Sequence, residues 1–357
     1  MITVVNLNPC IDWSYSVPSF THGGMNRVRR TRQDIAGKGI NVCVALKNMG
    51  LDPLCIGFNF AENGDILTSH LDALGIRHDF ITIDGAIRTN IKLYEESGTM
   101  TELNQPGAFV PVLFQEELEM KLRSSAPFSP FSQVQSARHC EKQRDEAVQS
   151  SNEPLDCFTY ARNDEKGILI LSGSRPQGVP ADFYARLCEA WIQSDSQNIV
   201  FFDTEGEALR LALESKAAPF AIKPNLFELE STFGVKLNSP QEIADFCRGE
   251  IMTPEKQNRP AVVCVSMGGD GAVLVTPTKS YFCPALGIEV RGVQGAGDAM
   301  VAGLVYAVTS NAPEAELLPH AMAAAAASVI RDGTEMCSRD DFDAMMTQAR
   351  ELVRKID

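Results

Sequence analysis

The sequence lacks the features that mark metal-binding, disulfide-linked, exported and membrane-spanning proteins. Its ten cysteines are scattered, with no CxxC pair and no histidine at ligand spacing, so neither a zinc site nor a disulfide framework is predicted. The amino terminus has no basic start followed by an apolar stretch, and no apolar run is long enough to span a membrane. We therefore expect reduced thiols, a cytoplasmic location and no membrane contact.

Positive charge is also scarce. Lys and Arg number 32 against 46 Asp and Glu, a formal net charge of −14. Nucleic-acid backbones are bound by clustered cations, so a general nucleic-acid binder is excluded and any anionic ligand must meet a local basic cluster. A chain of 357 residues with 44% hydrophobic composition can bury one large core. We expect a single enzyme-sized domain over residues 1–357.

Short apolar runs alternate with amphipathic stretches along most of the chain. The runs cover residues 2–7, 167–171, 198–202 and 261–266, and the helical patterns cover 39–50, 63–74, 181–194 and 296–309. This alternation predicts an α/β fold with a mostly parallel sheet, in which ligands bind beyond the carboxyl ends of the strands. Residues that follow strand ends are therefore the main candidates for a site.

Three stretches interrupt the alternation. Residues 13–34 and 87–104 contain strand-like pieces around a turn, which predicts a small β-sheet lid over one face, or alternatively an ordinary edge hairpin. A lid would exclude water from a reaction site, and its exposed edge could pair two subunits. Residues 124–166 lack periodicity and are rich in polar residues, as in a disordered surface insertion.

The motif GAGDAMVAGLVYA, starting at Gly295, predicts a glycine turn leading directly into a helix. The free backbone N–H groups of Gly295, Ala296 and Gly297, with the helix dipole, would hold a phosphate or a developing anion. Asp298 follows at once, which suits a base that accepts a proton from a hydroxyl attacking a γ-phosphate. The alternative role for Asp298 is a helix cap.

Two further segments place polar groups after strand ends. In AGKGIN, Gly37 permits close approach of a ligand, Lys38 supplies a cation and Asn41 can hydrogen-bond two hydroxyls. The alternative is a tight turn between a strand and a helix, with Lys38 exposed to solvent. Asp12, after the first strand, could bind sugar hydroxyls or serve as a turn residue.

The second half of the chain offers two candidate phosphate and metal segments. KPNLFELE sets Asn225 and Glu228 three residues apart, a spacing that could hold the waters of Mg²⁺ or form a helix cap. VSMGGDGA is a strand and a glycine turn that could cradle a nucleotide, as could any hairpin.

Basic residues gather in one region of this acidic chain. MNRVRRTRQDIAGK brings four arginines close to Lys38, and Arg88 and Lys92 come from the second lid stretch. Guanidinium groups match phosphate geometry, so the cluster predicts a substrate that already carries a phosphate. The alternative is a solvated edge that prevents aggregation.

Taken together, the motifs NPCID, NRV, AGKGINV, IRTNIKL, LSGSRPQG, DTEGEAL, IKPNLFELE, VSMGGDGA and GAGDAMVAG resemble, in this order, those of the ribokinase/PfkB carbohydrate kinases. NRV, Arg88 and LNQPG make the 1-phosphofructokinase and tagatose-6-phosphate kinase branch the most similar. The resemblance implies a three-layer α/β/α sandwich with a small β-sheet lid that is often shared in a homodimer. It also implies ATP and Mg²⁺.

The resemblance also implies roles for individual residues. Asp298 would be the catalytic base, with Gly295, Ala296 and Gly297 as the anion hole. The sugar would be bound by Asp12, Gly37, Lys38 and Asn41, and its phosphate by Arg27 and Arg88. Mg²⁺ would be bound through water by Asn225 and Glu228. The nucleotide would be bound by Lys223, Asn225, Ser266, Gly268 and Gly271.

Three residues depart from the family pattern, namely Gln294 before GAGD, Arg175 in LSGSRPQG and Glu205 in DTEGEAL. Gln294 and Glu205 could alter nucleotide affinity, and Arg175 could contact phosphate or face solvent. The leading hypothesis is phosphoryl transfer from ATP to a phosphorylated ketohexose, foremost fructose 1-phosphate. Tagatose 6-phosphate or fructose 6-phosphate kinases are alternatives, and so is an inactive sugar-phosphate or nucleotide binding protein.

Overall fold

The computed structural model describes residues 1–125, 166–253 and 259–357. The predicted insertion at 124–166 lies outside these residues except at its two ends. Among the described helices none is long and apolar enough to cross a membrane.

A large mostly parallel sheet forms the centre of the molecule, as the sequence predicts. Its strands run in the order β14-β13-β12-β11-β10-β9-β8-β1-β4-β5, parallel from β5 to β11 and antiparallel along the β12–β14 edge. The bounds are β1 Ile2–Asn6, β4 Pro53–Glu62, β5 Arg77–Ala86, β8 Ile168–Ser172, β9 Ile199–Asp203, β10 Ala221–Ile222, β11 Val262–Ser266, β12 Ala272–Val275, β13 Ser280–Cys283 and β14 Arg354–Lys355.

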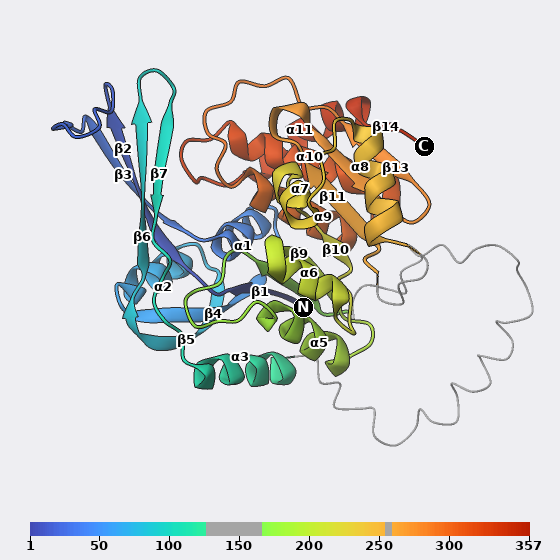
Figure 1. Ribbon diagram of the computed structural model, residues 1–357, viewed down its shortest axis with the longest axis horizontal. Helices are drawn as coiled ribbons and strands as arrows, with labels where there is room; N and C mark the ends of the chain where they lie inside the picture. The colour runs from blue at the N-terminus through green and yellow to red at the C-terminus, as the bar shows by residue number, and fades with distance from the viewer. Residues whose placement is uncertain (126–165, 254–258) are drawn as a thin grey trace, which may run out of the picture.

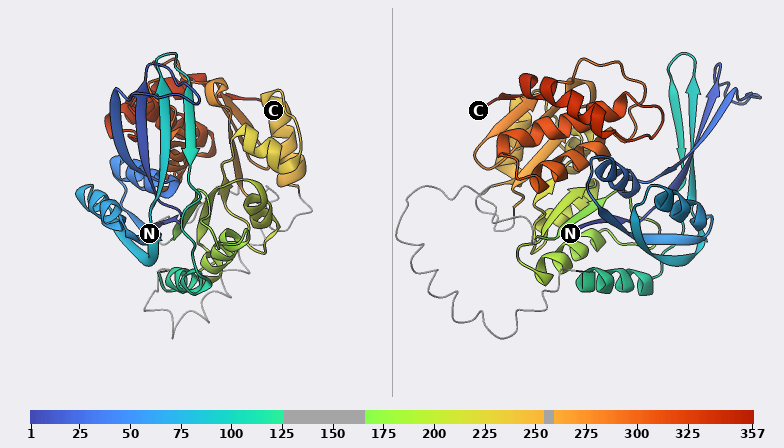
Figure 2. Two further views of the ribbon diagram at one scale, coloured as in Figure 1. Left: turned by 60° about the vertical axis from the view of Figure 1, so that its left-hand side comes forward. Right: turned by 180° about the vertical axis from the view of Figure 1, so that it is seen from behind.

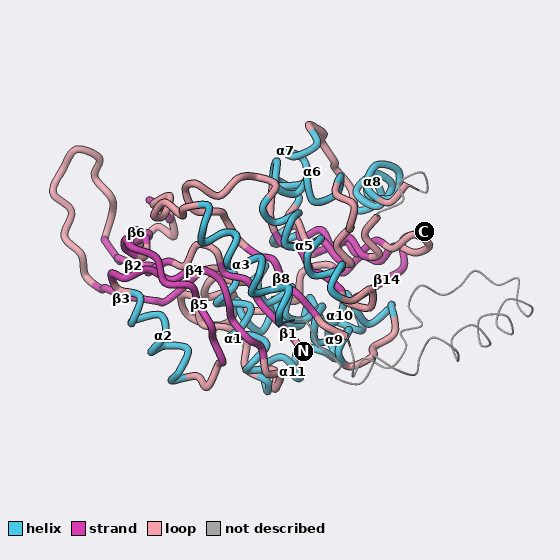
Figure 3. Tube along the Cα trace, turned by 90° about the horizontal axis from the view of Figure 1, so that it is seen from below, coloured by secondary structure: helices cyan, strands magenta, loops and turns pink. Residues whose placement is uncertain are grey.

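Helices cover both faces of this sheet, which lies between them in the view from below (Figure 3). One layer comprises α1 Lys38–Asn48, α2 Gly64–Ala73, α9 Ala296–Thr309, α10 Glu314–Val329 and α11 Arg339–Leu352. The other comprises α3 Val112–Ser125, α5 Phe183–Ser194, α6 Gly206–Glu214, α7 Leu226–Phe233 and α8 Pro240–Phe246, which a π-helical turn at Cys247–Ile251 extends. The predicted three-layer α/β/α class is confirmed.

Burial on both faces explains why the central strands are mostly apolar and do not alternate with exposed polar residues. Every residue of β1 and β8 is buried, a pattern typical of parallel strands covered by helices on each side. In the helical layer, α9 packs closely against α10 at Gly303, where an added Cβ would lie 2.4 Å from the carbonyl oxygen of His320. Close packing therefore holds α9, whose amino-terminal turn carries the GAGD motif, firmly in place.

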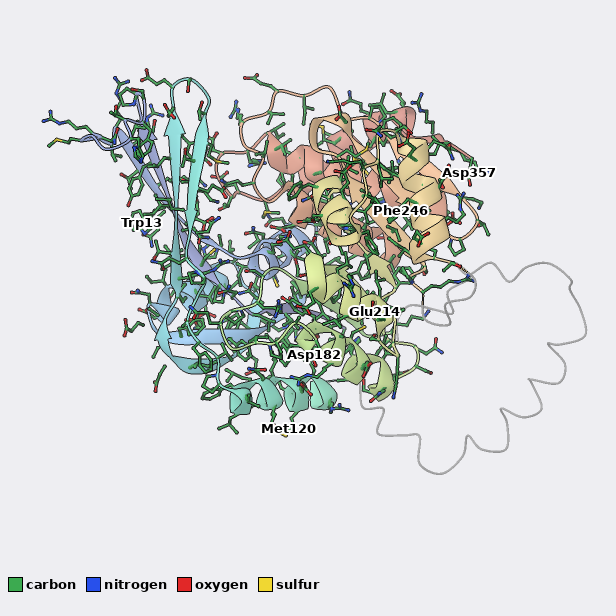
Figure 4. All side chains as sticks on the ribbon, viewed as in Figure 1. Trp13, Met120, Asp182, Glu214, Phe246 and Asp357 are labelled. Atoms are coloured by element: carbon green, nitrogen blue, oxygen red, sulfur yellow. The ribbon has the colours of Figure 1, made fainter. Side chains whose placement is uncertain are left out.

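A second sheet of four strands projects from the main domain (Figures 1 and 2). Its order is β3-β2-β6-β7, with bounds β2 Cys10–Val17, β3 Arg30–Ala36, β6 Arg88–Glu95 and β7 Met100–Asn104. The stretches 13–34 and 87–104 thus contribute to one sheet, which we call the lid. Asp12 faces the main domain, and Trp13 lies on the opposite, outer face, stacked against Tyr15 (Figure 4).

Candidate active site

Two cavities meet at the amino-terminal turn of α9. A polar cavity of about 440 Å³ lies between the lid and the carboxyl ends of β1, β8 and β9, and Gly295 lines it. An apolar cavity of about 260 Å³ lies on the other side of the same turn, where Ala296 and Gly297 line it together with Met300, Ala325 and other residues of α9 and α10. One helical turn therefore faces both spaces.

Asp298 lies in the first turn of α9 and is 5% exposed. The helix begins at Gly295, whose φ of 74° is a left-handed conformation that glycine adopts readily. The Asn41 amide donates a 2.7 Å hydrogen bond to Asp298 Oδ2. Burial raises the pKa of Asp298 to about 6, although the nearby Lys38 cation opposes the rise. A carboxylate with this pKa is poised to accept a proton near neutral pH.

Asp203, at the end of β9, joins two lysines beneath the polar cavity. Its oxygens lie 3.5 Å from Lys38 Nζ and 3.2 Å from Lys223 Nζ, and Ser172 donates a 2.9 Å hydrogen bond to it. Burial by itself raises the pKa of Asp203, but Lys223 and Lys38 outweigh burial, so that the pKa is lowered. The sequence drew attention to both lysines, whereas Asp203 was not assigned a role, although it begins the motif DTEGEAL and follows an apolar run.

Asp12 is held at the base of the lid by three donors. Asn90 Nδ2 lies 2.9 Å from Oδ1, Lys92 Nζ lies 2.5 Å from Oδ2, and the Cys10 thiol lies 3.2 Å from Oδ1. Lys92 also donates to Gln294 Oε1 at 2.5 Å. Asp12, Asn90, Lys92 and Gln294 all line the polar cavity. Asn90 was not among the predicted site residues, and Lys92 was noted only as part of the basic cluster.

Of three other residues predicted to bind the sugar or its phosphate, two line the polar cavity and one does not. Gly37 lines the polar cavity with φ 137°, and an added Cβ would lie 2.9 Å from Asn6 Oδ1. Arg88 also lines the cavity and donates to the Gln105 carbonyl oxygen at 3.1 Å. Arg27 is exposed in the loop between β2 and β3, and it does not line the cavity of its own chain.

The predicted metal pair forms a reciprocal helix cap. Asn225 accepts from the Glu228 backbone N–H, and the Glu228 carboxylate accepts from the Asn225 N–H, each at 2.8 Å. The Asn225 side chain is therefore used to begin α7. The Glu228 carboxylate also lines the polar cavity, with Oε1 3.8 Å from Lys38 Nζ.

The predicted nucleotide residues lie around the apolar cavity. Ser266, Gly268 and Gly271 line it, and Gly271 has φ 104°. Lys223 approaches the same turn from the sheet, because a Cβ at Gly297 would lie 3.2 Å from its Nζ. Asn225, which was also predicted to bind the nucleotide, does not line this cavity.

The three departures from the family pattern lie apart from the apolar cavity. Gln294 and Glu205 line the polar cavity, and the prediction that they could alter nucleotide affinity stays a prediction. Arg175 donates to the Val179 carbonyl oxygen at 2.8 Å and lines neither cavity.

Comparison with known proteins fits this geometry. A model of the pfkB family carbohydrate kinases matches residues 3–135 and 142–341, which is most of the chain. The chain belongs to the pfkB family of carbohydrate kinases. It is thus a phosphotransferase with an alcohol group as acceptor.

Relatives of this pfkB kinase include named enzymes. It is 31% identical to 1-phosphofructokinase of Bacillus subtilis, covering 88% of this chain and 87% of that one. It is 28% identical to 1-phosphofructokinase of Borreliella burgdorferi over 98% of each chain. Among solved structures, phosphofructokinase-2 of Escherichia coli with substrates and products matches with a TM-score of 0.79 and 23% identity, covering 98% of this chain and 99% of that one.

Proposed function

We propose that this kinase is a 1-phosphofructokinase, which transfers the γ-phosphoryl group of ATP to fructose 1-phosphate and forms fructose 1,6-bisphosphate and ADP. The observation that carries the proposal is the position of Asp298, in the one turn that faces both cavities. A sugar phosphate in the polar cavity and a nucleotide in the apolar cavity would bring their reacting ends together at this turn.

The residues of the turn supply the chemistry. Asp298 takes the proton of the attacking hydroxyl, a role that the raised pKa favours. The backbone N–H groups of Ala296, Gly297 and Asp298, at the start of α9, stabilise charge on the transferring group. The lid keeps water from competing with the sugar hydroxyl.

The sugar is oriented on the opposite wall of the polar cavity. Asp12 and Asn41 bind its hydroxyls, and the backbone of Gly37 lines the same cavity. Arg88, whose Nε is buried without a hydrogen-bond partner, binds its phosphate. Lys38 contributes positive charge between sugar and nucleotide, while Lys223 lies beside the turn that would receive the ATP phosphates.

The described residues fit a hydrated Mg²⁺ bound mainly through phosphate. They hold no cluster of three or more His, Cys, Asp or Glu side chains suited to a metal, but Mg²⁺ on ATP needs only one or two carboxylates and keeps several waters. Glu228 supplies a carboxylate on the cavity wall, with Asn225 fixing its position through the cap. Mg²⁺ would neutralise charge on the phosphates.

The choice of fructose 1-phosphate rests on the names of the relatives. Curated proteins at 28–31% identity are named 1-phosphofructokinase, and they match this chain over most of its length. The phosphofructokinase-2 structures are less than 25% identical and support the fold alone. Fructose 6-phosphate and tagatose 6-phosphate are therefore the alternatives to be compared directly.

We also propose that two copies of this cytoplasmic kinase pair through their lids. The outer face of the lid carries Trp13, Tyr15, Ile91 and Leu93, which are only partly buried in the single chain. Phe20 and Leu103 add exposed apolar surface nearby. Leu93→Glu should halve the mass measured by analytical ultracentrifugation, and an unchanged mass would place the interface elsewhere.

The described cysteines are all free and buried, as suits a reducing compartment.

The decisive experiment measures ADP release with MgATP and each of fructose 1-phosphate, fructose 6-phosphate, tagatose 6-phosphate and free fructose. Fructose 1-phosphate should have the highest kcat/KM, with fructose 1,6-bisphosphate as the product. A higher kcat/KM for a 6-phosphate would replace the proposed substrate, and turnover of free fructose alone would remove the requirement for a phosphorylated sugar.

A further inference from the structure

Gln294 connects the catalytic turn to the lid. It directly precedes Gly295, where the turn begins, and its side chain extends to strand β6. Its Oε1 accepts a 2.5 Å hydrogen bond from Lys92 Nζ, and its Nε2 donates a 2.9 Å hydrogen bond to the Tyr94 hydroxyl. Both polar ends of one amide are thus engaged by lid residues two positions apart on the same strand.

The Lys92 partner is already part of the sugar side of the site. Its side chain is 8% exposed, and its ammonium group is shared between Asp12 and Gln294. A continuous series of contacts therefore runs from the carboxylate that would bind the sugar, through Lys92, to the residue before the anion hole. Buried ammonium groups need such partners, so the three side chains constrain one another.

The side chain at position 294 is decisive for this connection. A shorter side chain such as Val, Thr or Gly could not both accept from Lys92 and donate to Tyr94 over the length of the Gln294 side chain. A second polar contact between lid and main domain, Arg32 with Glu335 at 3.3 Å, involves side chains 35% and 54% exposed. An exposed pair of that kind contributes little.

We propose that Gln294 is a positioning residue that couples the lid to the catalytic turn, so that sugar bound at Asp12 aligns the anion hole through Lys92 and Gln294. The proposal rests on the function proposed above. It predicts that the coupling limits transfer of the phosphoryl group to water when no sugar is bound, because a loosened lid admits water to the turn.

Gln294→Met tests the coupling, because it keeps the length of the side chain and removes both hydrogen bonds. We expect the KM for the sugar phosphate to rise about tenfold, the effect of losing two such bonds. The ratio of ATP hydrolysed to bisphosphate formed should rise with it. The KM for ATP should change less than the KM for sugar, a split that general destabilisation of the fold would not produce. A KM and a ratio both within twofold of wild type would overturn the proposal.

Tyr94→Phe and the double variant show whether the two residues act together. If Tyr94 acts through Gln294, the KM for the sugar phosphate should be no higher in the double variant than in Gln294→Met alone. If the two single-variant increases in KM multiply in the double variant, the residues have independent roles and the coupling is overturned. Glu335→Gln serves as the matched control, since it weakens a contact between the lid and the main domain that involves neither Gln294 nor Lys92, and it should leave the ratio unchanged.

A measurement without substrate separates this proposal from the proposed function. Hydrogen exchange of the ligand-free protein should be faster in residues 88–104 of Gln294→Met than of wild type, and equal in residues 168–172 of the core. If the wild type turns over no ketose phosphate while this difference is present, the proposed function fails and the connection stands. If the wild type is active but the exchange rates are equal, the connection fails.

Discussion

Asn41 in α1 donates a 2.7 Å hydrogen bond to Oδ2 of Asp298 in α9, across 257 positions of the chain. The bond connects the helix that begins after Gly37 to the helix that carries the proposed base. It also favours the ionised form of Asp298 and so lowers its pKa, against the larger effect of burial. The reactivity of the base therefore depends on a residue from the other half of the chain.

Replacing the base should abolish most of the activity without harming the fold. We expect Asp298→Asn to lower kcat by a factor of about 10² to 10⁴. Burial disfavours the ionised carboxylate at this position, so the neutral amide should leave the melting temperature unchanged or higher. Initial rates and calorimetry measure the two effects, and near-normal turnover would remove Asp298 from the proposed role.

Turnover should decline in acid as Asp298 becomes protonated. With a pKa raised to about 6, the base is lost as the pH falls below that value, so kcat should fall about tenfold for each further pH unit. Asn41→Leu removes a hydrogen bond to the charged form, so the midpoint should move to higher pH. Asn48→Leu, on the same helix but hydrogen-bonded to the Cys337 carbonyl oxygen, is the control.

The substrate phosphate itself titrates near pH 6, so the comparison between variants carries this test. Wild type and Asn41→Leu share the same substrate, and only the protein contribution differs between their profiles. Coincident midpoints under saturating substrate would mean that Asn41 does not tune the base.

Stability should depend strongly on Asp203. Asp203→Asn leaves Lys223, which is 4% exposed, without its counter-charge, and such a loss costs roughly 3 kcal/mol of unfolding free energy. Asp343→Asn breaks an exposed ion pair with Arg339 and should cost less than about 0.5 kcal/mol. Urea denaturation of both variants measures the two losses of unfolding free energy, and equal losses would contradict the stabilising role of Asp203.

Filling the apolar cavity should impair nucleotide binding alone. Ala325 is partly exposed on the cavity wall, so Ala325→Leu adds volume there without overpacking the core. We expect the KM for ATP to rise about tenfold or more, with the KM for sugar phosphate unchanged. A parallel rise of both constants would mean that the nucleotide does not occupy this cavity.

Much of the fold could be predicted because its signals are local. The helix predicted at 296–309 has the same first and last residues as α9, and the glycine turn before it fixes its start. The contacts of Asp12 could not be predicted, because they depend on the parallel pairing of β2 with β6, which sets Asp12 opposite Asn90 and Ser14 opposite Lys92. No pattern in either strand specifies that register.

The spacing of Asn225 and Glu228 shows a second kind of limit. Residues three apart at a helix start can face a metal or cap the helix, and the sequence is compatible with both. In the structure the side chain of Asn225 forms the cap, and Glu228 both completes the cap and reaches the cavity. Only the folded backbone distinguishes an oxygen used for capping from one that is available to a ligand.

The single helical turn between the two cavities also bears on how such kinases diversify. The polar cavity, where we propose that the sugar binds, is lined by the lid and the ends of β1, β8 and β9, whereas the apolar cavity is lined by α9, α10 and the turn after Ser266. Substitutions that line only the polar cavity, away from Gln294 and Lys92, can therefore change the preference for the acceptor sugar without altering the walls of the apolar cavity.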